Sequence, residues 1–152
     1  MIKLVCVGKI KEKFIQDGIN EYTKRLKAFD TFSLVEVKEV NTKTPLENMQ
    51  LEGVNILNKI GSDEFVVTLE IEGKSLDSVE LANFIENKKT YGTSKITFVI
   101  GGSNGLSSDV KTRSNFALSF SKFTFPHQLM RLIFVEQLYR AQTIINHQEY
   151  HK

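Results

Sequence analysis

Short runs of apolar and β-branched residues alternate along this chain with segments in which apolar residues recur at helical spacing. The predicted strands cover residues 2–7, 32–40, 64–71, 96–100 and 116–120. The predicted helices cover residues 14–26, 45–60 and 79–85, then a short helix capped by Ser107, Ser108 or Asp109, and a long one with Pro126 in its first turn. Because neighbouring parallel strands need long crossover connections, this alternation predicts an α/β fold with a mostly parallel sheet and helices on both faces.

Two glycines are expected to act as boundaries between these elements. Gly61 should end the second helix and Gly73 the third strand. The 152 residues, 41% of them hydrophobic, are enough for one core, so we expect a single domain over residues 1–152.

The apolar start of the chain does not have the order of a signal peptide, because its charges follow the apolar run, and no run of eighteen apolar residues occurs. We therefore expect a cytoplasmic protein without a membrane partner. The single cysteine, Cys6, lies in an apolar strand and is expected to pack as a small hydrophobic residue.

The formal net charge of +2 is too small to attract nucleic acid through the overall field. Any RNA contact must use local basic patches, although each patch also fits an ordinary solvated surface. The candidates are Lys9, Lys11 and Lys13; Lys24, Arg25 and Lys27; Lys111 with Arg113; and the terminal Lys152.

The last predicted helix is apolar almost all round over two turns. Its apolar residues are Met130, Leu132, Ile133, Phe134, Val135, Leu138 and Tyr139. A helix of this kind is expected to be buried on all sides, which predicts a homodimer packed through it. Glu136 and Arg140 are four residues apart on the same helix, so they either pair with each other or serve the function.

Two loops are candidates for ligand binding. FVIGGSNG, residues 98–105, ends a strand in three glycines, which fits either a tight turn or a close approach of the backbone to a ligand. Residues 120–125 contain three phenylalanines, which must cover either the core or a flat ligand. The glycine spacing is not GxGxxG, and Thr68 stands where a Walker motif needs glycine, which argues against a small-molecule nucleotide binder. His147 and His151 have no cysteine beside them, so no metal site is expected.

Several long blocks resemble one family, the RlmH family of SPOUT-class rRNA methyltransferases. They are VGKIKEKF, LEIEGKSLDS, IGGSNGL, RSNFALSFSKFTFPHQLMRLIFVEQLYRA and the terminal YHK. The resemblance implies a SPOUT-type fold with a C-terminal deep trefoil knot, a homodimer, and S-adenosyl-L-methionine as methyl donor. It also implies methylation of N3 of a pseudouridine in helix 69 of 23S rRNA, on the assembled ribosome.

The same resemblance assigns candidate site residues. The cofactor contacts would be Leu69, Gly101, Gly105, Phe120, Ser121, Lys122, Phe123, Thr124 and Phe125. The catalytic candidates are Arg140, Tyr150, His151 and Lys152, with His151 or an activated water as base and the two cations stabilising the anionic ring. Two alternatives remain open: a methyltransferase of this fold with another RNA target, and a non-catalytic ribosome-associated binding module.

Overall fold

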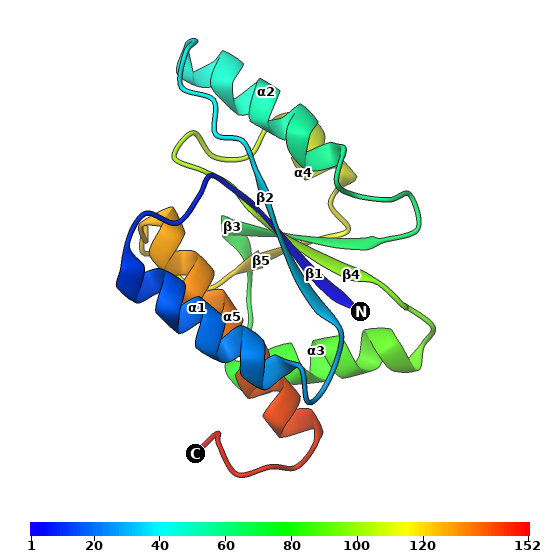
Figure 1. Ribbon diagram of the computed structural model, residues 1–152. Coiled ribbons are helices and arrows are strands. Elements are labelled where there is room, and N and C mark those ends of the chain that lie inside the picture. Colours follow the sequence, from blue (N-terminus) through cyan, green and yellow to red (C-terminus); the bar gives the residue numbers. More distant parts are fainter.

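The computed structural model describes all residues from 1 to 152 and has three layers, a five-stranded sheet between two groups of helices (Figure 1). The strands are β1 (Ile2–Val7), β2 (Phe32–Val37), β3 (Phe65–Ser75), β4 (Ile96–Ile100) and β5 (Phe116–Ser119). The helices are α1 (Lys13–Leu26), α2 (Pro45–Leu57), α3 (Ser78–Thr90), α4 (Ser108–Arg113) and α5 (His127–Ile145). The spatial order is β2-β1-β4-β3-β5 and every neighbouring pair is parallel, which confirms the predicted α/β class.

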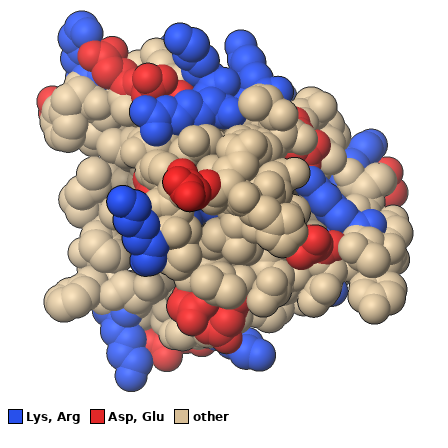
Figure 2. Space-filling view, turned by 90° about the horizontal axis from the view of Figure 1, so that it is seen from below, with Lys and Arg blue, Asp and Glu red and all other residues tan.

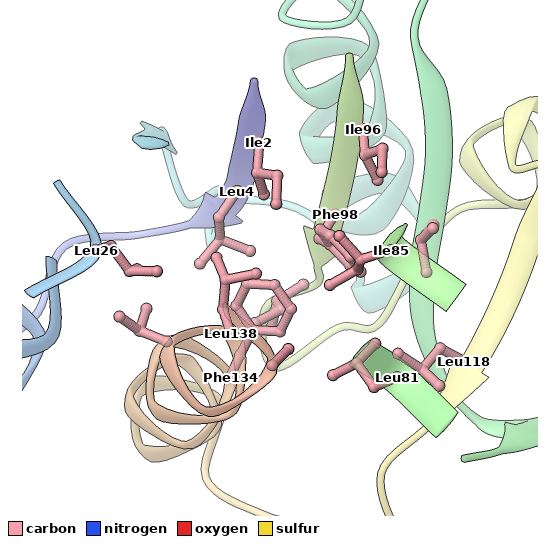
Figure 3. Packing of buried hydrophobic residues seen from close by; sticks show 14 of the residues in the cluster. Ile2, Leu4, Leu26, Leu81, Ile85, Ile96, Phe98, Leu118, Phe134 and Leu138 are labelled. Atoms are coloured by element: carbon pink, nitrogen blue, oxygen red, sulfur yellow. The ribbon is translucent and has the colours of Figure 1, made fainter. Parts of the chain in front are cut away.

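Helices cover both faces of the sheet, as the alternation predicted. On one face, α1, α3 and α5 pack over the larger core cluster, in which Phe98 of β4 contacts Phe134 of α5 with ring centroids 4.8 Å apart (Figure 3). On the other face, α2 and α4 cover a smaller cluster of valines, isoleucine and leucine. Cys6 is fully buried in the larger cluster, and burial raises the pKa of its thiol to about 12, so it packs as expected.

The long helix α5 is enclosed within the chain to a greater extent than its sequence predicted. It lies against the sheet between α1 and α3 (Figure 1), and Met130, Phe134, Val135 and Leu138 are buried there. The other three apolar residues of the predicted all-round surface are half-buried. The apolar character of α5 therefore does not by itself require a second subunit. None of the helices combines the length and apolarity needed to cross a membrane.

Some predicted boundaries were wrong for local reasons. The second strand ends at Val37 and not at residue 40, because the N–H of Val40 donates to the buried Glu52 carboxylate instead of extending the ladder. The helix α2 ends at Leu57, and the chain tightens into i→i+3 turns as far as Ile60. Pro126 is the N-cap of α5 and lies just outside its first turn.

The prediction that Gly73 ends the third strand was also wrong. The strand β3 continues to Ser75, with an irregularity at which both Leu69 and Lys74 lie opposite Leu118 of β5. Gly73 lies against the neighbouring strand so closely that a Cβ there would be 2.7 Å from the carbonyl carbon and oxygen of Ala117. This glycine therefore permits close packing of two backbones and does not terminate a strand.

Candidate functional site

A pocket of about 500 Å³ opens at the carboxyl ends of β3, β4 and β5. Parallel strands bring these ends to one edge of the sheet, where loops from distant parts of the sequence meet. Eight of the nine residues predicted to bind the cofactor line this pocket: Leu69, Gly101, Gly105, Phe120, Ser121, Phe123, Thr124 and Phe125. The ninth, Lys122, is exposed and does not line it.

The glycine loop presents its backbone to the pocket. The N–H of Gly105 donates to the carbonyl oxygen of Gly102 at 3.0 Å, and Gly105 has a φ of 82°, which closes a tight turn. A Cβ on Gly101 would lie 3.0 Å from Leu106 Cδ2 and 3.1 Å from the backbone of Gly105. The loop has no room for a side chain at Gly101, so a ligand there would meet peptide groups.

The phenylalanine loop combines the two roles that the sequence left open. Phe120 and Phe125 are partly buried against the larger core cluster, and the Phe120 ring lies 6.2 Å from that of Phe134. Phe123 is 77% exposed. The Ser121 hydroxyl oxygen accepts a hydrogen bond from the Phe123 N–H at 3.0 Å, which fixes the loop. Two rings therefore support the pocket wall while the third remains available to a ligand or partner.

The pocket is also lined by charged residues that were not predicted from the sequence. Glu70 accepts a hydrogen bond from the Thr68 hydroxyl at 2.6 Å, and its other oxygen lies 3.8 Å from Lys111 Nζ. Glu72 and His127 also line the pocket. Their position in the sequence could have identified them, because Glu70 directly follows Leu69 and His127 comes soon after the phenylalanine loop. With one lysine paired to one of two carboxylates, the pocket is unsuited to a polyphosphate and compatible with a cation.

The predicted catalytic residues form a second cluster at the other end of α5. Glu136 Oε1 accepts hydrogen bonds from Arg140 Nη2 at 2.7 Å, from Arg140 Nε at 3.1 Å and from the Tyr150 hydroxyl at 3.1 Å. The Arg140 Nη1 lies 3.1 Å from His151 Nδ1. Because a guanidinium only donates, Nδ1 accepts this bond and the imidazole proton is on Nε2. Lys152 is exposed and makes no hydrogen bond or ion pair.

Electrostatics and aromatic packing hold this cluster together. The hydrogen bond to Glu136 raises the pKa of Arg140, while burial and the hydrogen bonds to Tyr22 and Glu136 raise the pKa of Tyr150 well above its ordinary value. Tyr150 is therefore a neutral phenol that donates to Glu136. Its ring meets Tyr139 edge-on at 4.8 Å. Tyr22, on α1, was not identified from the sequence because nothing there connects it to the C-terminal tail.

The pocket and the tail cluster are far apart within one chain. Met130 lines the pocket and Arg140 belongs to the tail cluster, and at 1.5 Å per residue these helix positions are about 15 Å apart along α5. Figure 2 views the molecule from the end at which the tail lies in Figure 1. On this face Lys and Arg are interspersed with Asp and Glu around a broad uncharged area. The structure thus brings the predicted binding residues together, but not with the predicted catalytic residues.

A buried arginine ties the pocket end of α5 to β1. Arg131 is 1% exposed and donates to Glu36 at 2.7 Å and to the carbonyl oxygens of Val7 and Gly8 at 3.1 Å each. These three hydrogen bonds offset part of the cost of burying the charge, although Arg131 Nε has no partner, and they tie α5 to β1 and β2. Sequence reasoning missed it, because an arginine between Met130 and Leu132 shows no periodic signal of its own.

Comparison with known proteins agrees with this geometry. A family model described as "Predicted SPOUT methyltransferase" matches residues 1–151. Similar relatives carry the name "Ribosomal RNA large subunit methyltransferase H": those of Carboxydothermus hydrogenoformans and Acholeplasma laidlawii are each 48% identical, and that of Fusobacterium nucleatum is 45% identical. Each match covers 99% of both chains. The chain therefore belongs to the SPOUT methyltransferase family.

Proposed function

We propose that this protein transfers a methyl group from S-adenosyl-L-methionine to large-subunit ribosomal RNA, at N3 of a pseudouridine in helix 69 of 23S rRNA on the assembled ribosome. The observation that carries the proposal is the pocket at the strand ends, where Leu69, Gly101 and the phenylalanine loop meet. The printed name of the relatives supports large-subunit rRNA as the acceptor. The resemblance supplies the nucleotide and the position.

The residues of the pocket fit this methyl donor. The donor carries no phosphate, and its adenine needs apolar walls, which Leu69 and the phenylalanines offer. The exposed peptide groups at Gly101 suit its polar edges, since a Cβ would fill the space there. The negative charges of Glu70 and Glu72 attract a sulfonium cation, whereas they would repel a polyphosphate. When bound, the donor would supply an electrophilic methyl group.

The chain's own residues must then orient the base and remove the proton from N3. In the structure neither nitrogen of His151 is free, because Nδ1 accepts from Arg140 and Nε2 carries the proton. A water is therefore the proton acceptor in this arrangement, and His151 takes the role only after it leaves Arg140. Arg140 and Lys152 provide the positive charge that stabilises the anionic ring as N3 attacks. Tyr150, neutral and bonded to Glu136, orients the tail.

A homodimer would resolve the separation of the two clusters. In the structure the tail packs against Glu136 and Arg140, and Arg140 lies about 15 Å along α5 from Met130 at the pocket. The tail of a second chain would bring Arg140 and the residues after it to the pocket. The proposal includes the deep trefoil knot, which membership of the SPOUT methyltransferase family supports. Sedimentation equilibrium tests the dimer. The knot can be tested by stretching single molecules mechanically from both ends. A fully stretched length below that of 152 extended residues would support the knot.

The deciding experiment is methyl transfer with labelled donor. The protein is incubated with ribosomes from a strain that lacks the gene, and the nucleosides of the digested rRNA are identified by mass spectrometry. We expect N3-methylpseudouridine on intact ribosomes and far less on protein-free 23S rRNA. Methylation elsewhere would indicate a different RNA target, and donor binding without transfer would indicate a non-catalytic module. Equal rates on free RNA would contradict recognition of the assembled particle.

A further inference from the structure

The segment between β1 and α1 lies at the same edge of the sheet as the pocket and is fixed to α5. The Gln128 side chain accepts from the Lys11 N–H at 3.0 Å and donates to the Lys9 carbonyl oxygen at 3.1 Å. In Figure 1 this blue segment runs beside the orange start of α5. His127, the neighbour of Gln128, lines the pocket. The segment is therefore held next to the pocket by specific contacts.

Two of the three lysines in this segment form no ion pair within the chain. Lys9 and Lys11 are exposed and make no side-chain hydrogen bond or ion pair. Lys13 forms an exposed pair with Asp17 at 2.6 Å, and Glu12 forms no ion pair with any of the three lysines. What remains is a pair of free ammonium groups whose backbone is fixed by α5.

Lys9 and Lys11 precede the N-terminus of α1, so the helix dipole gives them no stabilisation. The first turn of this helix contains no acidic residue, and its N-cap, Glu12, makes no side-chain capping bond. Cations are disfavoured at this end of a helix and favoured at the other, where Lys24 and Arg25 occupy the last turn. The basic residues at the C-terminal end thus have a structural explanation, whereas Lys9 and Lys11 do not.

An exposed aromatic residue follows the lysines in the sequence. Phe14, the second residue of α1, is 66% exposed, although its neighbour Ile15 is buried in the usual way. Exposed aromatic rings next to cationic groups are the combination with which proteins bind single-stranded RNA, since the rings stack on unpaired bases and the cations contact phosphates.

We propose that residues 9–14, the basic segment, bind the RNA strand beside the methylated nucleotide, with Lys9 and Lys11 on the phosphates and Phe14 against an unpaired base. This rests on the proposed function, because the RNA is its methyl acceptor. A strand whose target base enters the pocket must continue across the surface next to it, and the basic segment occupies part of that surface.

The test measures binding to purified large ribosomal subunits as a function of KCl concentration at fixed Mg²⁺. The variant K9Q/K11Q is compared with K24Q/K27Q, which removes the same charge from the other end of α1. With a salt slope of about 0.7 per phosphate contact, two lost contacts weaken binding about 25-fold at 0.1 M salt and reduce the slope by about 1.4. Phe14→Ala should weaken binding about fivefold or more and leave the slope unchanged. Donor affinity, measured by calorimetry, should stay constant throughout.

The outcomes separate this inference from the proposed function. If the wild type methylates ribosomes but K9Q/K11Q binds subunits as the wild type does, the inference is overturned and the function stands. Equal losses in both double variants would also overturn it, because they would reflect overall charge. If no methyl is transferred but K9Q/K11Q alone loses subunit binding, the function fails and the RNA-binding segment stands.

Discussion

Replacing Gly73 with alanine tests how the pocket edge of the sheet is built. The new Cβ would lie 2.7 Å from the carbonyl carbon and oxygen of Ala117 and 2.8 Å from the carbonyl carbon of Leu118. These are backbone atoms in a strand, so they cannot swing away as a side chain does, and the two strands must separate by several tenths of an ångström. Overpacking of this kind costs about 1–3 kcal/mol, and we expect about 2–3 here.

The assay is urea unfolding with a matched glycine as control. In Gly61→Ala the nearest atom to the new Cβ is Asp63 Oδ1 at 2.9 Å, the end of an exposed side chain that is held only by a surface pair with Lys95 at 3.4 Å and can rotate away. We therefore expect Gly61→Ala to be neutral, or stabilising by up to about 1 kcal/mol through the unfolded state. Because Glu70 and Glu72 line the pocket just before Gly73, Gly73→Ala should also weaken donor binding. Wild-type stability and affinity in Gly73→Ala would refute the argument that backbone contact requires this glycine.

Three further changes test the pocket, its anchor and the charge network. Gly101→Val should abolish donor binding in calorimetry, since even a Cβ would contact Leu106 at 3.0 Å, and a folded variant with normal affinity would contradict the assignment. Arg131→Met should lower the free energy of unfolding by about 3 kcal/mol, whereas Arg25→Met, which breaks an exposed 3.9 Å pair, should cost under about 1. Burial alone would raise the pKa of Glu64, but hydrogen bonds from Lys3 and Thr97 lower it below 4.5. Ionised Glu64 therefore stabilises the fold above pH 4.5, and this stabilisation is lost as the pH falls through the pKa of the folded state. Melting curves from pH 7 to pH 3 should show this loss, and Lys3→Met should reduce it.

Much of the fold followed from local pattern, with errors where two segments meet. The five strands and a mostly parallel sheet were predicted, because fully buried strands such as Ile96–Ile100 read as unbroken apolar runs. The prediction at Gly73 was wrong, because a glycine that allows a neighbouring backbone to approach cannot be distinguished in the sequence from a glycine that ends a strand. The extent to which a single chain buries α5 was underestimated, because the sequence does not show that α1 and α3 flank the same helix.

The candidate site shows the same division. Its two loops were identified from composition, three glycines in one and three phenylalanines in the other, and eight of nine predicted residues line one pocket. Lys122 was included only because it lies between residues that do line it. Arg131 and Tyr22 were missed, because their partners are distant in the chain and no spacing relates them. Glu70 was missed although it directly follows the predicted residue Leu69.

The sequence by itself determined which segments form strands and helices, which loops carry the binding residues and which family the chain resembles, because each depends on neighbours within a few residues. Only the tertiary structure decided that β3 passes against β5 at Gly73, that Arg131 anchors α5 to β1, and that the tail packs on Arg140, about 15 Å along α5 from Met130 at the pocket. These depend on contacts between residues far apart in the chain, whose energies arise only when the complete fold brings the atoms together.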